Sequence, residues 1–432
     1  MSCTGPKPLA VLVLAGLALS QAGCVVGIAR HQSDLEHYLR NNQTAEALEV
    51  VELRRRVSRN KSIYLLDKAM LLRMQQEFEA SNTAFEEAKD VIEELDAISL
   101  REQAASVTIN DLMRSYLPPT FERVLIHCFK AMNYLELRQY DDARVEVLQL
   151  DEFLKQQDGF RLPFARYLSG LVFEFNQEPD NALIAYRKAY EAYRDNGRRI
   201  PSLLQQDLLR LTDYLGRVDE HRRFDEEFAL VSWPTQQRFR EQARAVAILF
   251  NGLIPRKHSH EILAQSPSDG QMHRISTPFY ERRYTRVHSA MLTSDLVAND
   301  SELFADLDRH ARAALEDEMP AIIARTVARV AVKNRVADEA GEEQPLFGLA
   351  LNVLAVLSEQ ADTRAWYTLP QEILVTRLEL EPGLHDLQLL LDGSFRPEAS
   401  PSWQQIQLEA GETVVFGLHW PESYSTLGGG YQ

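Results

Sequence analysis

Residues 164–195 read FARYLSGLVFEFNQEPDNALIAYRKAYEAYRD, and this stretch decides how the rest of the chain can fold. It predicts two antiparallel helices joined by a short turn at residues 177–180. Small residues stand where two such helices would touch: Gly170 on the first helix, Ala182 and Ala189 on the second. Because one helix pair cannot bury its apolar face alone, we expect further pairs beside this one.

The same stretch carries the pattern of a known repeat. Gly170, Phe173, Ala182, Tyr186 and Ala189 occupy the small, large, small, large and small positions of a tetratricopeptide repeat, which the stretch resembles. The large residues are expected to fill the groove against the next helix pair. Such a pattern describes a scaffold and contains no reaction chemistry.

Weaker units of the same kind precede this one. Ala47 and Ser81 take equivalent positions 34 residues apart, the tetratricopeptide period, whereas Ala131 and Gly170 are 39 residues apart. We therefore expect a tetratricopeptide-like helical array over residues 24–232 with a concave partner-binding face; a generic helical bundle without a groove is the alternative. The polar candidates to line that face are Arg73, Asn133 and Arg166.

The N-terminus has the features of a secretion signal. A weakly basic start at Lys7 precedes the apolar run LAVLVLAGLAL over residues 9–19, which is shorter than the roughly 20 residues that span a bilayer. Two small residues then precede Cys24. This arrangement resembles the lipobox of bacterial lipoproteins, in which the signal peptide is removed and the cysteine is acylated. It departs from that pattern at Gln21, where an aliphatic residue is usual.

The lipobox resemblance implies a location. Residues 1–23 would be a signal peptide and Cys24 would carry the lipid. Val25 after the cysteine, rather than Asp, implies anchoring in the outer membrane, facing the periplasm. Ordinary secretion, an uncleaved anchor and a cytoplasmic chain are the alternatives.

The composition indicates a globular protein with little affinity for nucleic acid. The 432 residues are 45% hydrophobic and 25% charged, which suits two or three domains with sizeable cores. A formal net charge of −16 lacks the basic footprint that phosphate backbones require. We expect membrane attachment through acyl chains alone, since an acidic chain gains nothing from anionic head groups. Cys128 lies in an apolar helical stretch, which predicts a buried thiol.

The second half of the chain has a different sequence pattern, in which strands and helices are mixed. Residues 233–371 predict a mixed region with a buried strand at 245–250 and two helices. The first helix would be capped by Asp300 or Ser301, and the second would begin at Pro320.

Further along, the apolar run LFGLALNVLAVL over residues 346–357 predicts a fully buried helix. From residue 372 the period becomes two, and four strands joined by turns predict a small antiparallel β-module over residues 372–420. Residues 421–432 predict a disordered tail. The fold class is therefore α+β. The last strand would turn four side chains to one core: Val414, Phe416, Leu418 and Trp420.

Three segments of this half carry a more specific resemblance. ILFNGLIPRK, MPAIIARTVARVAVKN and QADTRAWYTLPQEILVTRLELEPGLHDL are similar to segments of a family of uncharacterised bacterial lipoproteins, and the run ADTRxWxxLP from residue 361 is the most distinctive. The similarity extends over nearly the whole chain and departs at Gln21 and at residues 258–260. Genes of this family lie beside genes for lipoproteins that activate penicillin-binding proteins. The resemblance implies a role in the cell envelope and assigns no catalytic residue.

Two groups of residues could bind a metal ion or a ligand. His258 and His260 would share one face of a strand, but a metal needs a third ligand, and a solvated strand edge beside Lys257 is the favoured explanation. Asp362 and Arg364 could pair with each other or bind a polar ligand group, and Trp366 could stack on a sugar or a peptide. Alternatively, these three residues are structural: the aspartate orders the turn, the arginine satisfies backbone carbonyls and the tryptophan plugs the interface between helices and sheet.

The sequence favours a non-enzymatic adaptor of the cell envelope that binds a protein partner through its repeats, without cofactor, metal or nucleic acid. Two alternatives remain: an envelope enzyme acting on peptidoglycan or polysaccharide, with a site in residues 245–380, and a glycan-binding lipoprotein. A polar cleft holding Asp362 beside other acids would favour the enzyme. Exposed Trp366 or Trp403 would favour the glycan-binding protein, and a long open groove on the helices would favour the adaptor.

Overall fold

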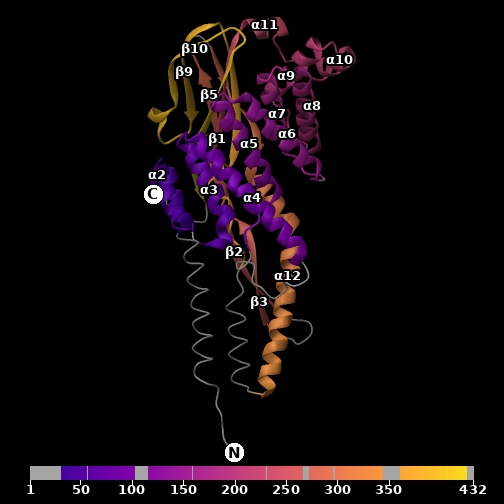
Figure 1. Ribbon diagram of the computed structural model, residues 1–432, viewed down its shortest axis with the longest axis vertical. Helices are drawn as coiled ribbons and strands as arrows, with labels where there is room; N and C mark the ends of the chain where they lie inside the picture. Colours follow the sequence, from indigo (N-terminus) through magenta and orange to yellow (C-terminus); the bar gives the residue numbers. More distant parts are fainter. Residues whose placement is uncertain are drawn as a thin grey trace, which may run out of the picture.

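The computed structural model has an α+β fold, as the sequence predicts (Figure 1). Cys24 with the predicted lipobox, and the apolar run 346–357, lie outside the described residues. The structure describes residues 31–55, 57–102, 115–157, 159–229, 231–265, 272–294, 297–343 and 361–425.

The first half is an array of antiparallel helix pairs. Residues 31–40 are helical and pair with α2, and the later pairs are α3 with α4, α5 with α6, α7 with α8, and α9 with α10. Apolar side chains from successive pairs form one continuous core. The bounds are α2 Thr44–Glu52, α3 Lys61–Met74, α4 Phe78–Glu102, α5 Thr120–Glu136, α6 Tyr140–Lys155, α7 Pro163–Phe175, α8 Pro179–Asp195, α9 Ser202–Tyr214 and α10 Val218–Glu227.

One turn geometry recurs at all five of these pairs and defines the repeat better than the sequence spacing does. A residue with positive φ lies two positions after the end of each first helix, and the N–H of the residue that follows donates to the carbonyl five residues earlier, as in a Schellman cap. Four of these positions are not glycine, which hides the signal in the sequence. The positive-φ residues are Asn42, Gln76, Arg138, Gln177 and Gly216.

The predicted crossing point at Gly170 is confirmed. A Cβ placed on Gly170 would lie 2.3 Å from Cε1 of Tyr186, which is far inside contact distance. Both residues are buried between α7 and α8. Only a residue without a side chain lets the two helices approach this closely.

The second half contains two four-stranded sheets packed face to face. The first has the order β11-β1-β8-β7 and the second the order β10-β9-β5-β6. The strands of the first sheet are β1 Ala243–Asn251, β7 Glu302–Asp306, β8 Glu372–Leu380 and β11 Thr413–Trp420. Those of the second are β5 Ser289–Thr293, β6 Ala298–Asp300, β9 Gly383–Asp392 and β10 Ser402–Leu408.

The expected boundary between residues 371 and 372 does not separate the two sheets. β1 lies between β11, to which it is parallel, and β8, to which it is antiparallel, so strands from 233–371 and from 372–420 share one sheet. The expected antiparallel pairing is present between β9 and β10, whereas β11 departs from it by pairing parallel with β1. β11 crosses to the far side of β1 because both faces of β1 are apolar and buried, the environment in which parallel pairing is stable.

Three layers result: helix array, first sheet and second sheet. One face of β1, with Val246, Ile248 and Phe250, joins the core of the array. The opposite face, with Ala245 and Leu249, joins a separate core against the second sheet. The predicted inward face of β11 is confirmed, because its four alternate side chains pack in that second core: Val414, Phe416, Leu418 and Trp420.

A long helix and a hairpin extend from one end of this body. α12 runs from Leu307 to Glu343 beside the hairpin of β2 (Lys257–Gln265) and β3 (Met272–Tyr280) (Figure 1). The expectation of two helices divided at Pro320 is wrong, because α12 continues through the proline. The expected cap at Asp300 or Ser301 is also wrong. Residues 302–306 pair with β8 as a strand, and the helix begins only after them.

Two further findings complete the fold. β12 (Ser423–Ser425) pairs with β4 (Arg283–Thr285), so the start of the predicted disordered tail is ordered. Backbone hydrogen bonds to β4 hold it in place.

Within the described parts of the chain, no helix combines the length and the apolar character needed to cross a membrane. The remaining helix, α11, covers Gln236–Glu241.

Candidate functional site

The concave face of the array is covered by the chain's own first sheet. Arg73 and Asn133, predicted to line an open groove, are both buried. The Arg73 guanidinium donates to the Asn133 amide oxygen and lies 5.4 Å from the ring centroid of Phe250 on β1. The Asn133 amide nitrogen in turn donates to Ser81 and Asn82, at 2.9 and 2.8 Å. Both side chains are enclosed by the protein itself, so the prediction of an open groove at these residues is wrong.

A glycine on β11 makes this covering possible. The N–H of Gly417 donates to a carboxylate oxygen of Glu136 at 2.6 Å, and the same carboxylate lies 3.7 Å from the Arg73 guanidinium. A Cβ on Gly417 would lie 2.2 Å from that guanidinium. The array and the sheet therefore meet without room for any side chain at residue 417.

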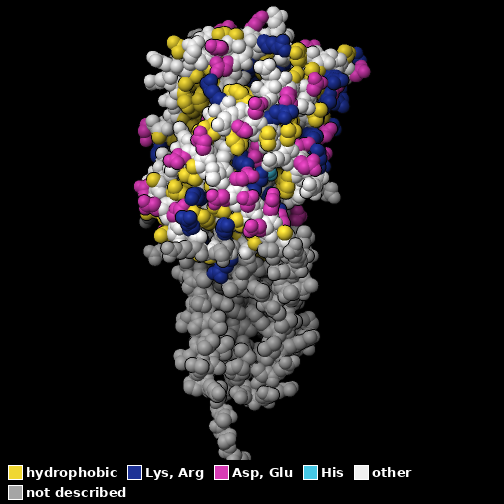
Figure 2. Space-filling view, viewed as in Figure 1, with side chains coloured by type: hydrophobic (Ala, Val, Ile, Leu, Met, Phe, Trp, Pro, Cys, Tyr) yellow, Lys and Arg dark blue, Asp and Glu magenta, His cyan; other side chains and the backbone are white. Residues whose placement is uncertain are grey.

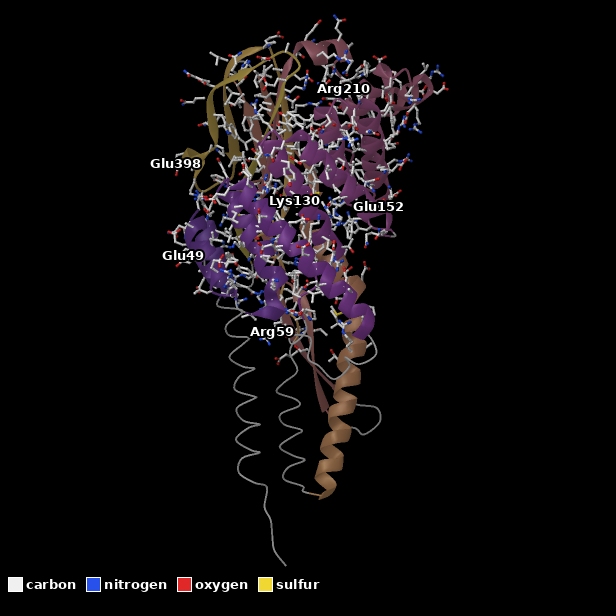
Figure 3. The ribbon with its side chains drawn as sticks, in the orientation of Figure 1. Glu49, Arg59, Lys130, Glu152, Arg210 and Glu398 are labelled. Carbon is white, nitrogen blue, oxygen red and sulfur yellow. The ribbon has the colours of Figure 1, made fainter. Side chains whose placement is uncertain are left out.

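A buried charge cluster fixes the other end of the same interface. Arg377 on β8 contacts Asp207 on α9 at 2.8 Å, and Asp207 also lies 3.3 Å from Arg210. Arg210, which lies where α9 approaches the sheets, forms a further ion pair with Glu174 (Figure 3). Two acids and two bases thus neutralise one another where the array meets the sheet.

Arg166, the third predicted groove residue, stabilises the array from within. Its guanidinium pairs with Asp151 on α6, and the same carboxylate accepts from Lys188 on α8 at 2.7 Å. Burial alone would raise the pKa of Asp151, but Lys188 and Arg166 outweigh burial and hold that pKa at about 2. Three successive helices are joined by this one carboxylate.

The ADTRxWxxLP residues are structural, as the second reading of the motif expected. Trp366 is fully buried, and its ring meets those of Phe85 and Phe129 edge-on, with centroids 5.9 Å away in each case. Arg364 pairs with Asp362 at 2.6 Å and donates to the Asn60 amide oxygen at 3.0 Å. The motif therefore plugs the interface between the array and the sheets, and no stacking face of the tryptophan reaches solvent.

Two carboxyl groups beside this plug are buried without a cation in direct contact among the described residues. Asp67 accepts from the Thr368 hydroxyl at 2.9 Å, and Glu122 accepts from the Tyr116 hydroxyl at 2.7 Å. Burial raises the pKa of each group to about 7, against the weaker opposing effect of these hydrogen bonds. Sequence reasoning missed both residues because isolated acids in helices look like surface positions.

A cleft of about 1270 Å³ opens between α12 and the helix ends of the array that face it. Its walls come from the starts of α5 and α7, the end of α8, the first turns of α12 and the base of the β2–β3 hairpin. Asp362 and Arg364 line it, together with Asp306 and Glu318. Such a cleft is the feature expected of the enzyme alternative.

Three acids of this cleft are, however, held in ion pairs, while Asp317 on α12 is exposed to solvent. Asp362 is bound by Arg364, Asp306 lies 3.5 Å from Arg198, and Glu318 lies 3.5 Å from Arg325. A carboxylate held by a guanidinium stays ionised and is a poor proton donor. The geometry therefore suits binding better than acid–base catalysis.

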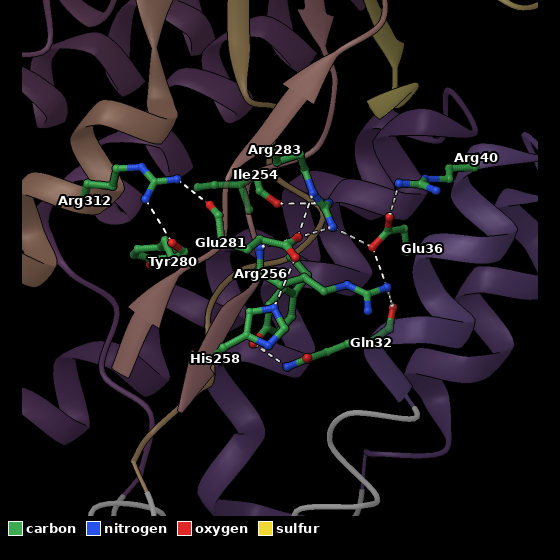
Figure 4. Close-up of polar contacts among 11 residues, drawn as sticks. Gln32, Glu36, Arg40, Ile254, Arg256, His258, Tyr280, Glu281, Arg283 and Arg312 are labelled. Atoms are coloured by element: carbon green, nitrogen blue, oxygen red, sulfur yellow. Dashed lines mark hydrogen bonds and ion pairs between the residues drawn. The ribbon is translucent and has the colours of Figure 1, made fainter. Parts of the chain in front are cut away.

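The predicted histidine pair lies at the base of the hairpin, next to a cluster of charges (Figure 4). His258 contacts Glu281 at 3.2 Å, while His260 lies at the ring edge of Phe279. Among the described residues, no group of three His, Cys, Asp or Glu side chains could hold a metal ion. The neighbouring carboxylate of Glu36, from the helical residues 31–40, is bound by three arginines: Arg40 and Arg256 at 2.5 Å and Arg283 at 2.8 Å.

We call this group the N-terminal clamp: Glu36, Arg40, Arg256 and Arg283. The clamp joins the first described helix to the hairpin base and the start of β4. Burial alone would raise the pKa of Glu36, but its three arginines outweigh burial and lower that pKa. The start of the described chain is thereby fixed to the end of the body from which α12 and the hairpin extend (Figure 4).

Comparison with known proteins gives only distant structural likeness. No family model matches the chain, and no curated protein matches it. MamA from Desulfovibrio magneticus RS-1 superposes over 48% of this chain and 93% of its own, with a TM-score of 0.32 and 16% identity. The apo form of RapI superposes over 46% of this chain and 52% of its own, with a TM-score of 0.37 and 10% identity. Likeness at this level identifies no function.

Proposed function

We propose that this protein is a non-enzymatic, outer-membrane lipoprotein, anchored through Cys24, whose helix array binds a protein partner of the cell envelope. One observation carries the proposal: the outer helices keep exposed apolar side chains although the concave face is already filled. Val145 and Leu148 on α6 are 50% and 43% exposed, and Ile184 on α8 is 47% exposed. We call these three residues the outer patch.

The outer patch lies on a rigid frame. Arg144 on α6 pairs with Glu178 at the start of α8, and Asp151 on α6 pairs with Lys188 on α8. These two bridges hold the helices side by side. Val145 and Leu148 are three residues apart on α6, so they share one face. Single exposed apolar residues are ordinary, but three of them on two helices joined by ion pairs make this face our candidate for the binding surface.

The surface charge is compatible with a protein partner. Acidic and basic side chains are interspersed over the face shown in Figure 2, without a broad basic area. A nucleic-acid partner would require such an area. Apolar anchors framed by mixed charges instead match the anatomy of protein–protein interfaces.

The anchoring part of the proposal rests on the N-terminal residues. The resemblance of residues 9–24 to a lipobox supports acylation at Cys24, and the clamp fixes the helical residues that follow. Six residues, 25–30, lie between Cys24 and the first described residue, and six residues reach about 20 Å at most. An acylated Cys24 would therefore hold the hairpin end of the body close to the membrane.

The test is crosslinking in envelope membranes followed by capture of the full chain. Leu148→Asp combined with Ile184→Asp should abolish the crosslinked partners that the wild type captures. The matched control is Leu384→Asp, at a 65% exposed position on β9, which should change nothing. Equal crosslinking by wild type and the double variant would refute the outer patch. Membrane fractionation of Cys24→Ala tests the anchor separately, and unchanged membrane attachment would refute acylation at that residue.

A further inference from the structure

We propose that the cleft between α12 and the array binds a long-chain fatty acid, with the acyl chain along α12 and the carboxylate at Lys257. This is a ligand site distinct from the outer patch. It rests on three features of the described residues: an apolar stripe on α12, the lack of free backbone groups along that stripe, and one cation without an ion-pair partner.

The first feature is the apolar lining. Ala311, Leu315 and Ile322 follow the helical period on α12 and line one side of the cleft. Leu117 and Phe160, from the near end of the array, line the other side. Charged side chains form much of the remaining lining, so this apolar stripe along α12 is the part of the cleft that suits an acyl chain.

The second feature concerns hydrogen bonds. α12 forms one side of the cleft from Arg309 to Arg325, and inside this helix the backbone N–H and C=O groups already bond one another. An extended peptide lying along α12 would bury amide groups without partners on that side, which is costly. An acyl chain has no such groups. The α12 side of the cleft therefore favours an acyl chain over an extended peptide.

The third feature is Lys257, at the start of β2 on the cleft floor. Its ammonium lies 5.4 Å from the centre of the Tyr280 ring, and no carboxylate of the described chain lies within 4.0 Å of it. Burial disfavours this charge, but Tyr280 and the more distant acids Asp362, Glu122 and Glu318 outweigh burial and raise the pKa of Lys257. The lysine therefore stays charged at neutral pH.

The other basic groups of the cleft are already neutralised or face water. Arg198 and Arg325 lie beside acids, as does Arg161, which is 3.2 Å from Asp195. Arg309 is exposed, and burial lowers the pKa of His310 to about 4, so the imidazole is uncharged at neutral pH. One unmatched positive charge on the floor complements one carboxylate on the ligand.

The experiment uses the full chain in membranes with photoactivatable diazirine palmitate, and maps labelled peptides by mass spectrometry. Labels are expected on residues 307–325 and 115–121. Lys257→Met should lower palmitate labelling about tenfold, the loss expected for one charge-assisted hydrogen bond. The same substitution should change labelling by the uncharged diazirine hexadecanol less than twofold. Ala314→Trp, which fills the cleft, should reduce labelling by both probes.

Lys155→Met, at a 59% exposed lysine on α6, is the matched control and should leave both probes unchanged. Thermal unfolding of each variant shows that it is folded. Labels outside the cleft, or an equal effect of Lys257→Met on both probes, would overturn the proposal. Displacement of palmitate by an amphipathic helical peptide but not by excess unlabelled palmitate would also overturn it, because the cleft would then be a peptide site.

Discussion

Replacement of Arg377 by Met tests whether the array and the sheets form one cooperative unit. Asp207 is fully buried and has two cations: Arg377 at 2.8 Å and Arg210 at 3.3 Å. Methionine keeps most of the arginine's apolar stem but leaves the cluster with one uncompensated negative charge. Breaking a buried pair in this way costs about 3–5 kcal/mol. Because Arg210 remains beside Asp207, we expect a loss of free energy of unfolding of about 3 kcal/mol.

The assay is urea unfolding of the wild type, Arg377→Met, Asp207→Asn and the double variant. The two single losses should not add, because the double variant removes the buried charge along with its partner. A coupling free energy of about 2 kcal/mol between residues 377 and 207 is expected from this cycle. A loss below about 1 kcal/mol for Arg377→Met, or additive losses, would refute the view that this interface depends on the cluster.

Two further predictions concern the array and its plug. Gly170→Ala should destabilise the protein by about 1–2 kcal/mol in urea unfolding, because the clash with Tyr186 outweighs the helix propensity gained. The loss should shrink in a Tyr186→Leu background, and a more stable Gly170→Ala would contradict the packing argument. Asp67 and Glu122 bind protons in the folded state up to a pKa of about 7, above their unfolded values, so stability should fall as the pH rises from about 4 to 7. Asp67→Asn with Glu122→Gln should flatten that slope, and an unchanged slope would show that other groups cause it.

The helical half was predictable where the signal is local. Gly170 and its neighbours mark a close helix crossing, and the structure has that crossing. The repeat turns were harder to detect, because positions such as Gln76 and Arg138 adopt positive φ without glycine. Pro320 led to the wrong prediction of a helix boundary. A proline usually begins or breaks a helix, but tertiary contacts of α12 carry the helix through it.

The site was less predictable because it depends on long-range pairing. Arg73 and Asn133 look like groove residues, since polar side chains on repeat helices usually face solvent. Whether the chain fills its own groove depends on β11 reaching β1 across about 170 residues of sequence, which no local pattern encodes. A strand apolar on both faces, such as 245–250, was the available signal, because it requires a packed layer on each side.

The parallel pairing of β1 with β11 has a consequence for how the protein is made. Val415, on the last strand but one, completes the core that the array begins. A chain that is synthesised from its N-terminus must therefore display an uncovered helical groove and an unpaired central strand until residues 413–420 have been made. Contacts this distant in sequence form slowly, and the exposed strand edge is prone to aggregate meanwhile. We therefore expect this chain to depend more on a chaperone during synthesis than a repeat protein whose contacts are all close in sequence.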